Sequence, residues 1–265
     1  MLRRPHNRAV ETVAPTLLLM LFVVALLAGC VDAVAGGGGL LTLPALLLAQ
    51  VPPVHALATN KLQSSFGTLT SAVSMRRRGL TDGVQLTVPF LCALAGAALG
   101  AVSIQFVRTD TLQVAVPVVL VAIGLYFVFM PGNGTESRDP RMSTRTYHSM
   151  VVPGIGFYDG AFGPGTGSFF TAAGVSLRGQ HLVAATAQAK TLNFATNIAA
   201  LVVFLIGGKL MWVLGGIMAI GQIAGAYVGA IIVHRGGARL IRPIVVVMCV
   251  AMLVQYLWKE DLLPW

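Results

Sequence analysis

Long apolar runs separated by short polar connections make up most of the 265-residue chain. The longest runs hold about 20 residues each, which is enough for a helix to cross a bilayer. The full series of apolar segments is 13–34, 39–50, 57–75, 84–107, 111–130, 147–162, 167–178, 184–206, 210–233 and 240–258. This pattern predicts an all-α polytopic membrane protein.

A second pattern is an internal duplication. Asp32 in "GCVDAVAGGGG" and Asp159 in "GFYDGAFGPGTG" lie 127 positions apart. Other matches at the same separation are Gly29 with Gly156, Gly36 with Gly163, Gly38 with Gly165, Thr59 with Thr186 and Arg108 with Arg235. A constant separation indicates two repeats of about five apolar segments each. We delimit them as 1–130 and 147–265, joined by a polar linker at 131–146.

The second segment of each repeat is short and follows a glycine cluster. About twelve helical residues rise about 18 Å, which is less than the hydrocarbon core of about 30 Å. A short helix after a glycine turn suggests a broken or re-entrant helical hairpin, and such a pair at matching places in two repeats points to a transporter binding site. The alternative is that the glycines serve close helix packing.

The two glycine turns could bind an anion. Each turn leads into a helix whose first N–H groups have no partner within the helix, and the positive end of the helix dipole adds to their attraction. The candidate residues in these turns are Gly36, Gly37, Gly38, Gly39, Gly163, Gly165, Thr166 and Gly167.

A polar stripe opens the third segment of each repeat. In the second repeat Thr186, Lys190, Asn193 and Asn197 share one helical face. The positions at the same offset in the first repeat are Thr59, Gln63, Phe66 and Thr70, with Asn60 and Lys61 beside them. Lys190 is the strongest candidate, because an ionisable residue inside a membrane helix is usually functional. The alternative is that its ammonium group reaches an interface.

Asp32 and Asp159 are the only carboxylates inside apolar runs. They could bind a proton, pair with a lysine, or cap the glycine turn through backbone N–H groups. We favour capping or pairing over proton coupling.

The composition limits which binding partners are expected. The net charge of +9 comes mostly from basic residues in the connections, which encode topology, so we expect contact with membrane lipid and no nucleic acid. The histidines, His55 and His181 among them, lack metal-site spacing, and no cofactor is expected. Cys30, Cys92 and Cys249 form no CxxC pair. A lipoprotein signal ending at Cys30 is an alternative, but cleavage there would cut the first repeat.

The stretches "VDAVAGGGGLLTLPALL" and "ALATNKLQSSFGTLTSA" resemble the first signature of the TauE/SafE family of sulfite exporters, also called the toluene-sulfonate uptake permease family. "DGAFGPGTGSFF" and "AATAQAKTLNFATNIAAL" resemble its second signature. The resemblance covers nearly the whole chain and implies export of sulfite or an organosulfonate, such as sulfoacetate, across a bacterial inner membrane. It also implies substrate contacts from the glycine turns and from Thr59, Asn60, Lys61, Gln63, Thr186, Lys190 and Asn193. Thr171 replaces the family's second proline, so we expect the second short helix to be less kinked than the one containing Pro44.

The resulting hypothesis is a transporter that holds an anion at the midplane and alternates access by moving one bundle against another. A passive anion channel and an intramembrane aspartyl protease are the alternatives; no polar stretch is long enough for a soluble catalytic domain, and we expect no enzyme. Inverted repeats would place the arginine-rich connections inside and both termini outside, whereas parallel repeats would place the N-terminal arginines inside. We prefer inverted repeats. The sequence leaves a homodimer open.

Overall fold

The computed structural model describes residues 15–112, 114–116, 118–119, 122 and 137–234. Most of the expected segment 111–130, all of 240–258, the N-terminal arginines, Cys249 and part of the linker lie outside these residues. Every expected apolar segment that falls inside them is helical, and the described residues contain no strand. The first half contains α1 (Pro15–Ala35), α2 (Gly39–Leu48), α3 (Pro53–Arg77) and α4 (Thr87–Gln105). The second half contains α6 (Thr144–Thr146), the π-helical turn η2 (Tyr147–Val151), α7 (Val152–Ala161), α8 (Thr166–Arg178), α9 (Leu182–Ile206) and α10 (Trp212–His234).

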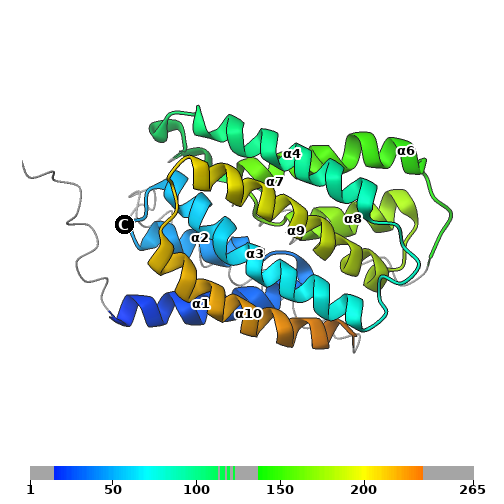
Figure 1. Ribbon diagram of the computed structural model, residues 1–265, viewed down its shortest axis with the longest axis horizontal. Coiled ribbons are helices and arrows are strands. Elements are labelled where there is room, and N and C mark those ends of the chain that lie inside the picture. The colour runs from blue at the N-terminus through cyan, green and yellow to red at the C-terminus, as the bar shows by residue number, and fades with distance from the viewer. Residues whose placement is uncertain (1–14, 113, 117, 120–121, 123–136, 235–265) are drawn as a thin grey trace, which may run out of the picture.

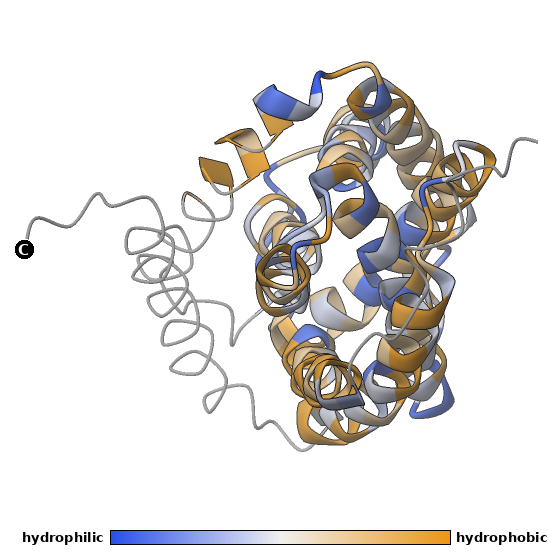
Figure 2. Ribbon diagram, turned by 90° about the vertical axis from the view of Figure 1, so that its left-hand side faces the viewer, coloured by the Kyte–Doolittle hydropathy of each residue, from blue (hydrophilic) through white to orange (hydrophobic). Residues whose placement is uncertain are grey.

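Four of these helices are long and apolar enough to cross a membrane, namely α1, α4, α9 and most of α10. Helix α3 has the same length as α9, 25 residues, but many of its positions are polar, so it falls outside that group. Those polar positions face inward: Lys61, Gln63 and Thr59 are buried, whereas Leu19, Leu99 and Ile206 are exposed on the outer faces of other helices. Figure 2, which looks along the bundle, shows hydrophilic segments enclosed among the helices. Such an apolar exterior around a polar interior suits a protein surrounded by lipid.

The helices form two groups. The first bundle, as we call it, consists of α1, α2, α3 and α10, in which α10 packs along both α1 and α3. The second bundle consists of α4, α7, α8 and α9, in which α4 packs along both α7 and α9. Helices α3 and α9 pack against each other and join the two bundles. Because α10 comes from the second half of the chain and α4 from the first, each bundle contains segments of both halves.

Glycines allow the closest of these helix contacts. A Cβ atom at Gly225 of α10 would overlap the backbone of Leu26 in α1, and one at Gly100 of α4 would overlap the backbone of Phe157 in α7. Small residues bring helix backbones together in this way where lipid offers no hydrophobic drive for association. These two glycines, which lie outside the glycine turns, therefore serve helix packing.

Helices α3 and α9 run in opposite directions. In Figure 1, α3 begins at the end of the bundle where α9 finishes, and α4 and α10 are likewise antiparallel to one another. Side-chain contacts agree, because His55, near the start of α3, bonds through Nδ1 to the backbone oxygen of Lys209, just beyond the end of α9, at 2.8 Å.

Candidate functional site

The turn between α1 and α2 is organised by Asp32. Its backbone oxygen accepts from the Gly36 N–H at 2.7 Å, and its Oδ1 accepts from the Gly38 N–H at 3.3 Å. Gly36 has φ of 76°, a left-handed conformation that glycine adopts without strain. Asp32 thus caps the turn, as the sequence suggested, and occupies one N–H group that we had considered for an anion.

The turn between α7 and α8 is built around Asp159 in the corresponding place. Asp159 Oδ1 accepts from the Thr166 hydroxyl at 2.7 Å, and the Tyr158 hydroxyl donates to the Pro164 backbone oxygen at 2.7 Å. Gly163 and Gly165 both have positive φ, 98° and 78°. The aspartate here holds the turn through a side-chain hydroxyl rather than through a backbone N–H.

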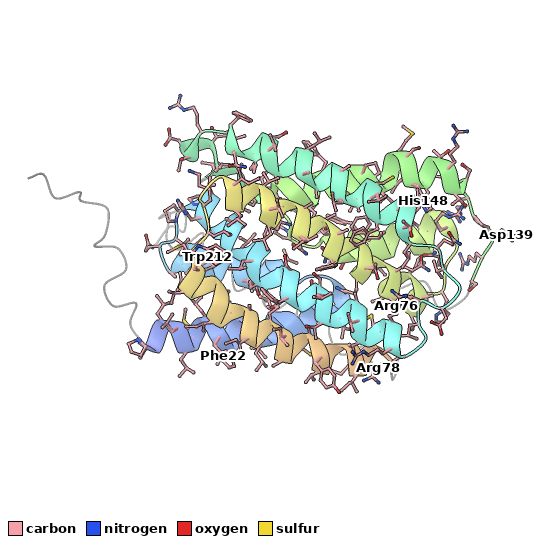
Figure 3. The ribbon with its side chains drawn as sticks, in the orientation of Figure 1. Phe22, Arg76, Arg78, Asp139, His148 and Trp212 are labelled. Carbon is pink, nitrogen blue, oxygen red and sulfur yellow. The ribbon has the colours of Figure 1, made fainter. Side chains whose placement is uncertain are left out.

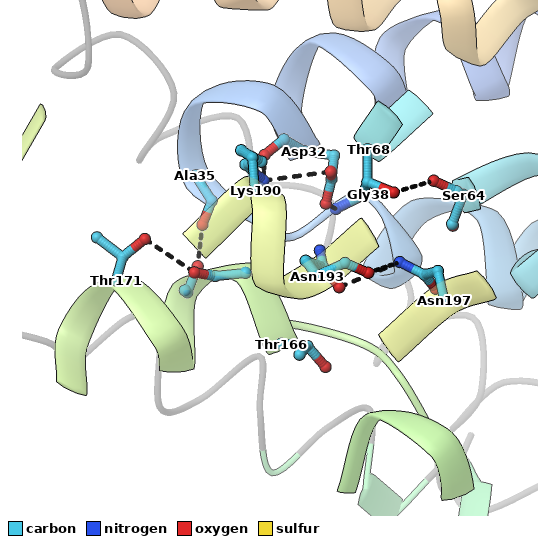
Figure 4. A network of polar contacts seen from close by, with 12 residues as sticks. Asp32, Ala35, Gly38, Ser64, Thr68, Thr166, Thr171, Lys190, Asn193 and Asn197 are labelled. Carbon is cyan, nitrogen blue, oxygen red and sulfur yellow. Dashed lines mark hydrogen bonds and ion pairs between the residues drawn. The ribbon is translucent and has the colours of Figure 1, made fainter. Parts of the chain in front are cut away.

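The two glycine turns touch each other. A Cβ atom at Gly36 would overlap the backbone of Gly167, and one at Gly39 would lie 3.2 Å from Pro164 Cα. The Ser168 hydroxyl donates to the Ala35 backbone oxygen across the same contact (Figure 4). Residues about 130 positions apart in sequence therefore form one backbone junction in the interior, which explains why both turns are rich in glycine.

Lys190 of α9 reaches this junction and pairs with Asp32. Its Nζ lies 3.2 Å from Asp32 Oδ2 and also donates to the Asp32 backbone oxygen (Figure 4). The lysine is 0% exposed. Its ammonium group is therefore held inside the protein rather than extended to an interface, and the pair joins the second bundle to the first.

Lys61 of α3 makes the reciprocal connection. Its Nζ lies 2.9 Å from Asp159 Oδ1 and donates to Asn197 Oδ1 at 3.2 Å. Lys61 and Asp159 are both 1% exposed. The sequence placed Lys61 beside the polar stripe but gave it no partner, because the pairing depends on how α3 packs against the opposite half.

The two lysines do not occupy equivalent positions in the repeats. At the 127-residue separation Lys190 corresponds to Gln63, and Lys61 corresponds to Gln188. Each aspartate is nevertheless bound by a lysine from the opposite bundle. The centre is thus symmetric in its charges but not in the helix positions that supply them.

Amide and hydroxyl side chains extend the polar centre. Asn60 Oδ1 accepts from the Thr42 hydroxyl at 2.6 Å and from Gln63 Nε2 at 2.8 Å. Asn197 Nδ2 donates to Asn193, to the backbone oxygen at 2.8 Å and to Oδ1 at 3.1 Å. Buried polar side chains normally need such partners. Asn60, Gln63 and Asn193 are therefore brought together with the lysines, as expected.

Part of the expected stripe does not enter the centre. Phe66 is 44% exposed and the Thr70 hydroxyl bonds its own helix backbone at the surface, so the first-half stripe does not continue along this face. Thr59 and Thr186 are buried, but Thr59 Oγ1 accepts from the Met211 N–H at 3.4 Å and Thr186 donates to the Leu182 backbone oxygen. Thr59 thus bonds a backbone group just before α10, and Thr186 bonds a backbone group in the first turn of its own helix.

Some buried polar residues were not predicted from the sequence. Thr42 lies within the short helix α2, Ser168 lies just after the second glycine turn, and Gln222 is 1% exposed within α10. A lone amide in an apolar run such as 210–233 is a signal from which Gln222 could have been predicted. His55 bonds a backbone oxygen, and no group of three or more potential metal ligands occurs among the described residues.

Comparison with known proteins agrees with the family resemblance seen in the sequence. The family model described as "Sulfite exporter TauE/SafE" matches residues 21–256. The chain is 41% identical over 256 residues to "Probable membrane transporter protein YfcA" of Escherichia coli strain K12, covering 96% of this chain and 95% of that protein. It is 42% identical over 241 residues to "Probable membrane transporter protein ORF9" of a Sinorhizobium species, covering 91% and 92%. A "Probable membrane transporter protein" of Haemophilus influenzae is 41% identical over 244 residues, covering 92% and 96%. No solved structure matches.

Proposed function

Because this chain belongs to the TauE/SafE sulfite exporter family and is a multi-pass membrane transporter, not an enzyme, we propose that it exports a small sulfur-containing anion. The anion class is sulfite or an organosulfonate such as sulfoacetate, and the membrane is the bacterial inner membrane. The observation that carries the proposal is the pair of buried lysines, Lys61 and Lys190, inside an apolar bundle. Buried ammonium groups with amides around them are suitable ligands for an oxyanion.

The repeats are inverted in this proposal. The support is that α3 and α9, which correspond at the 127-residue separation, run antiparallel, as do α4 and α10 (Figure 1). The packing pairs also correspond: α1 packs on α10 as α7 packs on α4. Inverted repeats whose interface holds the binding site are a common transporter design.

The glycine turns belong to re-entrant hairpins. Helix α2 has 10 residues and α8 has 13, so they rise about 15 Å and about 20 Å, less than the bilayer core. Their turns meet in the interior, where Lys61 and Lys190 lie. Non-helical backbone at membrane depth is tolerated when protein covers it, as it does here.

Alternating access would come from motion of the first bundle against the second. Lys190–Asp32 and Lys61–Asp159 both bridge the two bundles, so an anion that competes for either lysine changes the contact between them. A transport cycle needs such a two-state element that the ligand biases.

The two ends of the molecule differ in a way that fits this cycle. At the end near residues 83–86, a cavity of about 340 Å³ opens beside Tyr147, Arg178 and Gln188. At the other end, Lys209 and Met211 just beyond α9 are hydrogen-bonded to His55 and Thr59 near the start of α3. The cavity does not reach Lys190, so we regard it as part of an entry route rather than as the binding site.

Counterflow in proteoliposomes tests the proposal. Vesicles loaded with unlabelled sulfite should take up labelled sulfite, with sulfoacetate and taurine as competitors. Lys190→Gln should slow counterflow at least about tenfold, the equivalent of one lost charge-assisted contact of about 1.5–3 kcal/mol. Lys209→Gln is the matched control, because the hydrogen bonds of Lys209 to other described residues use its backbone N–H and oxygen, and it should leave counterflow unchanged. Electrical conductance without counterflow would indicate a channel instead.

A further inference from the structure

We propose that Asp159 is the proton-binding carboxylate of the transport cycle and takes up one proton for each anion that Lys61 binds. This inference rests on the proposed function and assigns its coupling ion to one residue. Asp32, at the matching position of the other repeat, has both of its carboxylate oxygens engaged and is not assigned this proton.

Hydrogen bonding distinguishes the two aspartates. Both carboxylate oxygens of Asp32 are engaged, Oδ1 by the Gly38 N–H and Oδ2 by Lys190. In Asp159 a single oxygen, Oδ1, accepts both contacts, from Lys61 and from Thr166. Its Oδ2 is buried and accepts no hydrogen bond from any residue that the structure describes. A buried carboxylate oxygen without a donor is costly, and this oxygen is where a proton is most readily accepted.

Charge balance links that proton to the anion. The centre contains the ammonium groups of Lys61 and Lys190 and the carboxylates of Asp32 and Asp159, which sum to zero. An anion beside Lys61 would face the Asp159 carboxylate, and leaving a buried charge without its partner costs about 3–5 kcal/mol. Protonation of Asp159 reduces this conflict, because the added proton offsets one negative charge of the anion: the centre is again neutral with a monovalent anion and carries a charge of −1 with a divalent one.

The proton also completes the hydrogen bonding. A carboxylic acid gains an O–H donor at Oδ2, and an oxygen of the bound anion is an acceptor for it. Lys61 stays in place after Asp159 is neutralised because it still donates to Asn197 Oδ1 at 3.2 Å. One O–H bond forms on Asp159 with a proton from water on one side of the membrane, and the same bond breaks when that proton returns to water on the other side.

Among the residues that the structure describes, few other titratable groups surround Asp159. Helices α4, α8, α9 and η2 pack against α7. Their ionisable side chains are Cys92 on α4, Arg178 at the last residue of α8, Lys190 on α9, and Tyr147 with His148 on η2. Tyr158 beside Asp159 bonds the Pro164 backbone oxygen, and Lys190 is engaged by Asp32. Lys61 is thus the cation that bonds Asp159 directly.

Coupling of this kind is compatible with export. A monovalent anion moves with its proton as a neutral pair, and it leaves the cell when its outward concentration gradient exceeds the inward proton gradient. A divalent anion moves with a net charge of −1, which an inside-negative membrane potential drives outward. The proton on Asp159 thus reduces the charge that crosses the membrane, and the balance of the anion gradient, the proton gradient and the membrane potential sets the direction of transport.

The test uses the full chain in proteoliposomes with labelled sulfoacetate and the membrane potential clamped at zero. Between about pH 7 and 8 sulfoacetate carries no proton itself, since carboxylates titrate near pH 4. With one proton per anion, an outside medium about one pH unit more acidic should concentrate sulfoacetate up to about tenfold. Asp159→Asn should reduce this accumulation ratio to about one while exchange of labelled for unlabelled sulfoacetate stays measurable. Asp32→Asn can slow transport, because it breaks the pair with Lys190, but it should keep the accumulation ratio within about twofold of the unmodified protein, since that ratio reports protons moved per anion and not the rate.

A second measurement does not depend on how the variants fold. In the unmodified protein, a trapped pH dye should report one proton entering with each sulfoacetate. Net uptake of sulfoacetate without proton entry would overturn this inference and leave the proposed function standing, as would an Asp159→Asn protein that still accumulates sulfoacetate. Equal loss of the ratio in both aspartate variants would also overturn the assignment. Absence of counterflow with sulfoacetate and with sulfite would overturn the proposed function itself.

Discussion

Each charge in the centre is neutralised by a residue from the opposite bundle, and this makes single residues matter for stability as well as for transport. Lys190 and Asp32 have almost no contact with solvent, so neither can exchange its partner for water. Arg108 and Asp110 form a pair of similar length at 3.1 Å, but with side chains 83% and 77% exposed. Exposed pairs contribute little to stability, whereas breaking a buried pair leaves an unsolvated charge.

We therefore predict different costs for breaking the two pairs. Lys190→Met should lower the free energy of unfolding by about 3–5 kcal/mol, because Asp32 is left charged and buried. Adding Asp32→Asn should restore a large part of that loss. Arg108→Gln is the exposed control and should cause little change. Thermal unfolding in detergent, arranged as a double-mutant cycle, measures these values; a Lys190→Met protein as stable as Arg108→Gln would show that the buried pair is not needed.

At the scale of helices, glycine decides which surfaces can meet. Gly225 and Gly216 lie on the same helix, α10, and differ in their surroundings. A Cβ atom at Gly225 would overlap the backbone of Leu26 in α1, whereas one at Gly216 would meet no described atom within 4 Å. Backbone cannot move aside as a flexible side chain can, so the two positions separate a packing role from the intrinsic cost of glycine in a helix.

This contrast gives a prediction for α10. Gly225→Ala should destabilise the protein by about 1–3 kcal/mol, because it forces α1 and α10 apart. Gly216→Ala should be neutral, or more stable by up to about 1 kcal/mol, because alanine favours helix. Unfolding in detergent and the yield of monodisperse protein measure both variants. Equal effects of the two substitutions would contradict the close contact between Gly225 of α10 and the backbone of Leu26 in α1.

The helices themselves could be predicted well from the sequence. Apolar runs placed α1, α4, α9 and α10 to within a few residues, and the glycine clusters correctly anticipated that α2 and α8 are short. Sequence reasoning also assigned Lys61, Lys190, Asn60, Gln63 and Asn193 to one common site. It could not show that Lys61 pairs with Asp159, because that contact depends on the packing of α3 against the other half. The sequence pattern also predicted that the polar stripe of the first repeat extends to Phe66 and Thr70, but both residues lie at the surface.

At the scale of the whole molecule, the basic residues gather at one end. The described arginines near the cavity end are Arg76, Arg77, Arg78, Arg138, Arg141, Arg145 and Arg178. The opposite end carries Arg108 and Lys209. Figure 3 shows Arg76, Arg78 and Asp139 at the first end and Trp212 toward the other. Cytoplasmic connections of membrane proteins are enriched in arginine and lysine, so the first end should face the cytoplasm.

Two exposed aspartates at opposite ends allow this orientation to be measured. Asp139 adjoins Arg138, which bonds Gly179 just before α9 begins, and Asp110 follows α4, whose Gln105 lies beside Gly207 where α9 ends. In a chain with its cysteines replaced, Asp110→Cys should react in intact cells with a thiol reagent that cannot cross the inner membrane, because its end faces outward. Asp139→Cys should react only after that membrane is permeabilised, and neither change removes an arginine that sets the topology. The opposite labelling pattern would show that the protein has the opposite orientation in the membrane. Labelling of both cysteines in intact cells would contradict the arrangement of α4 and α9 on which inverted repeats depend, since residues at the two ends of α9 would then lie on one side of the membrane.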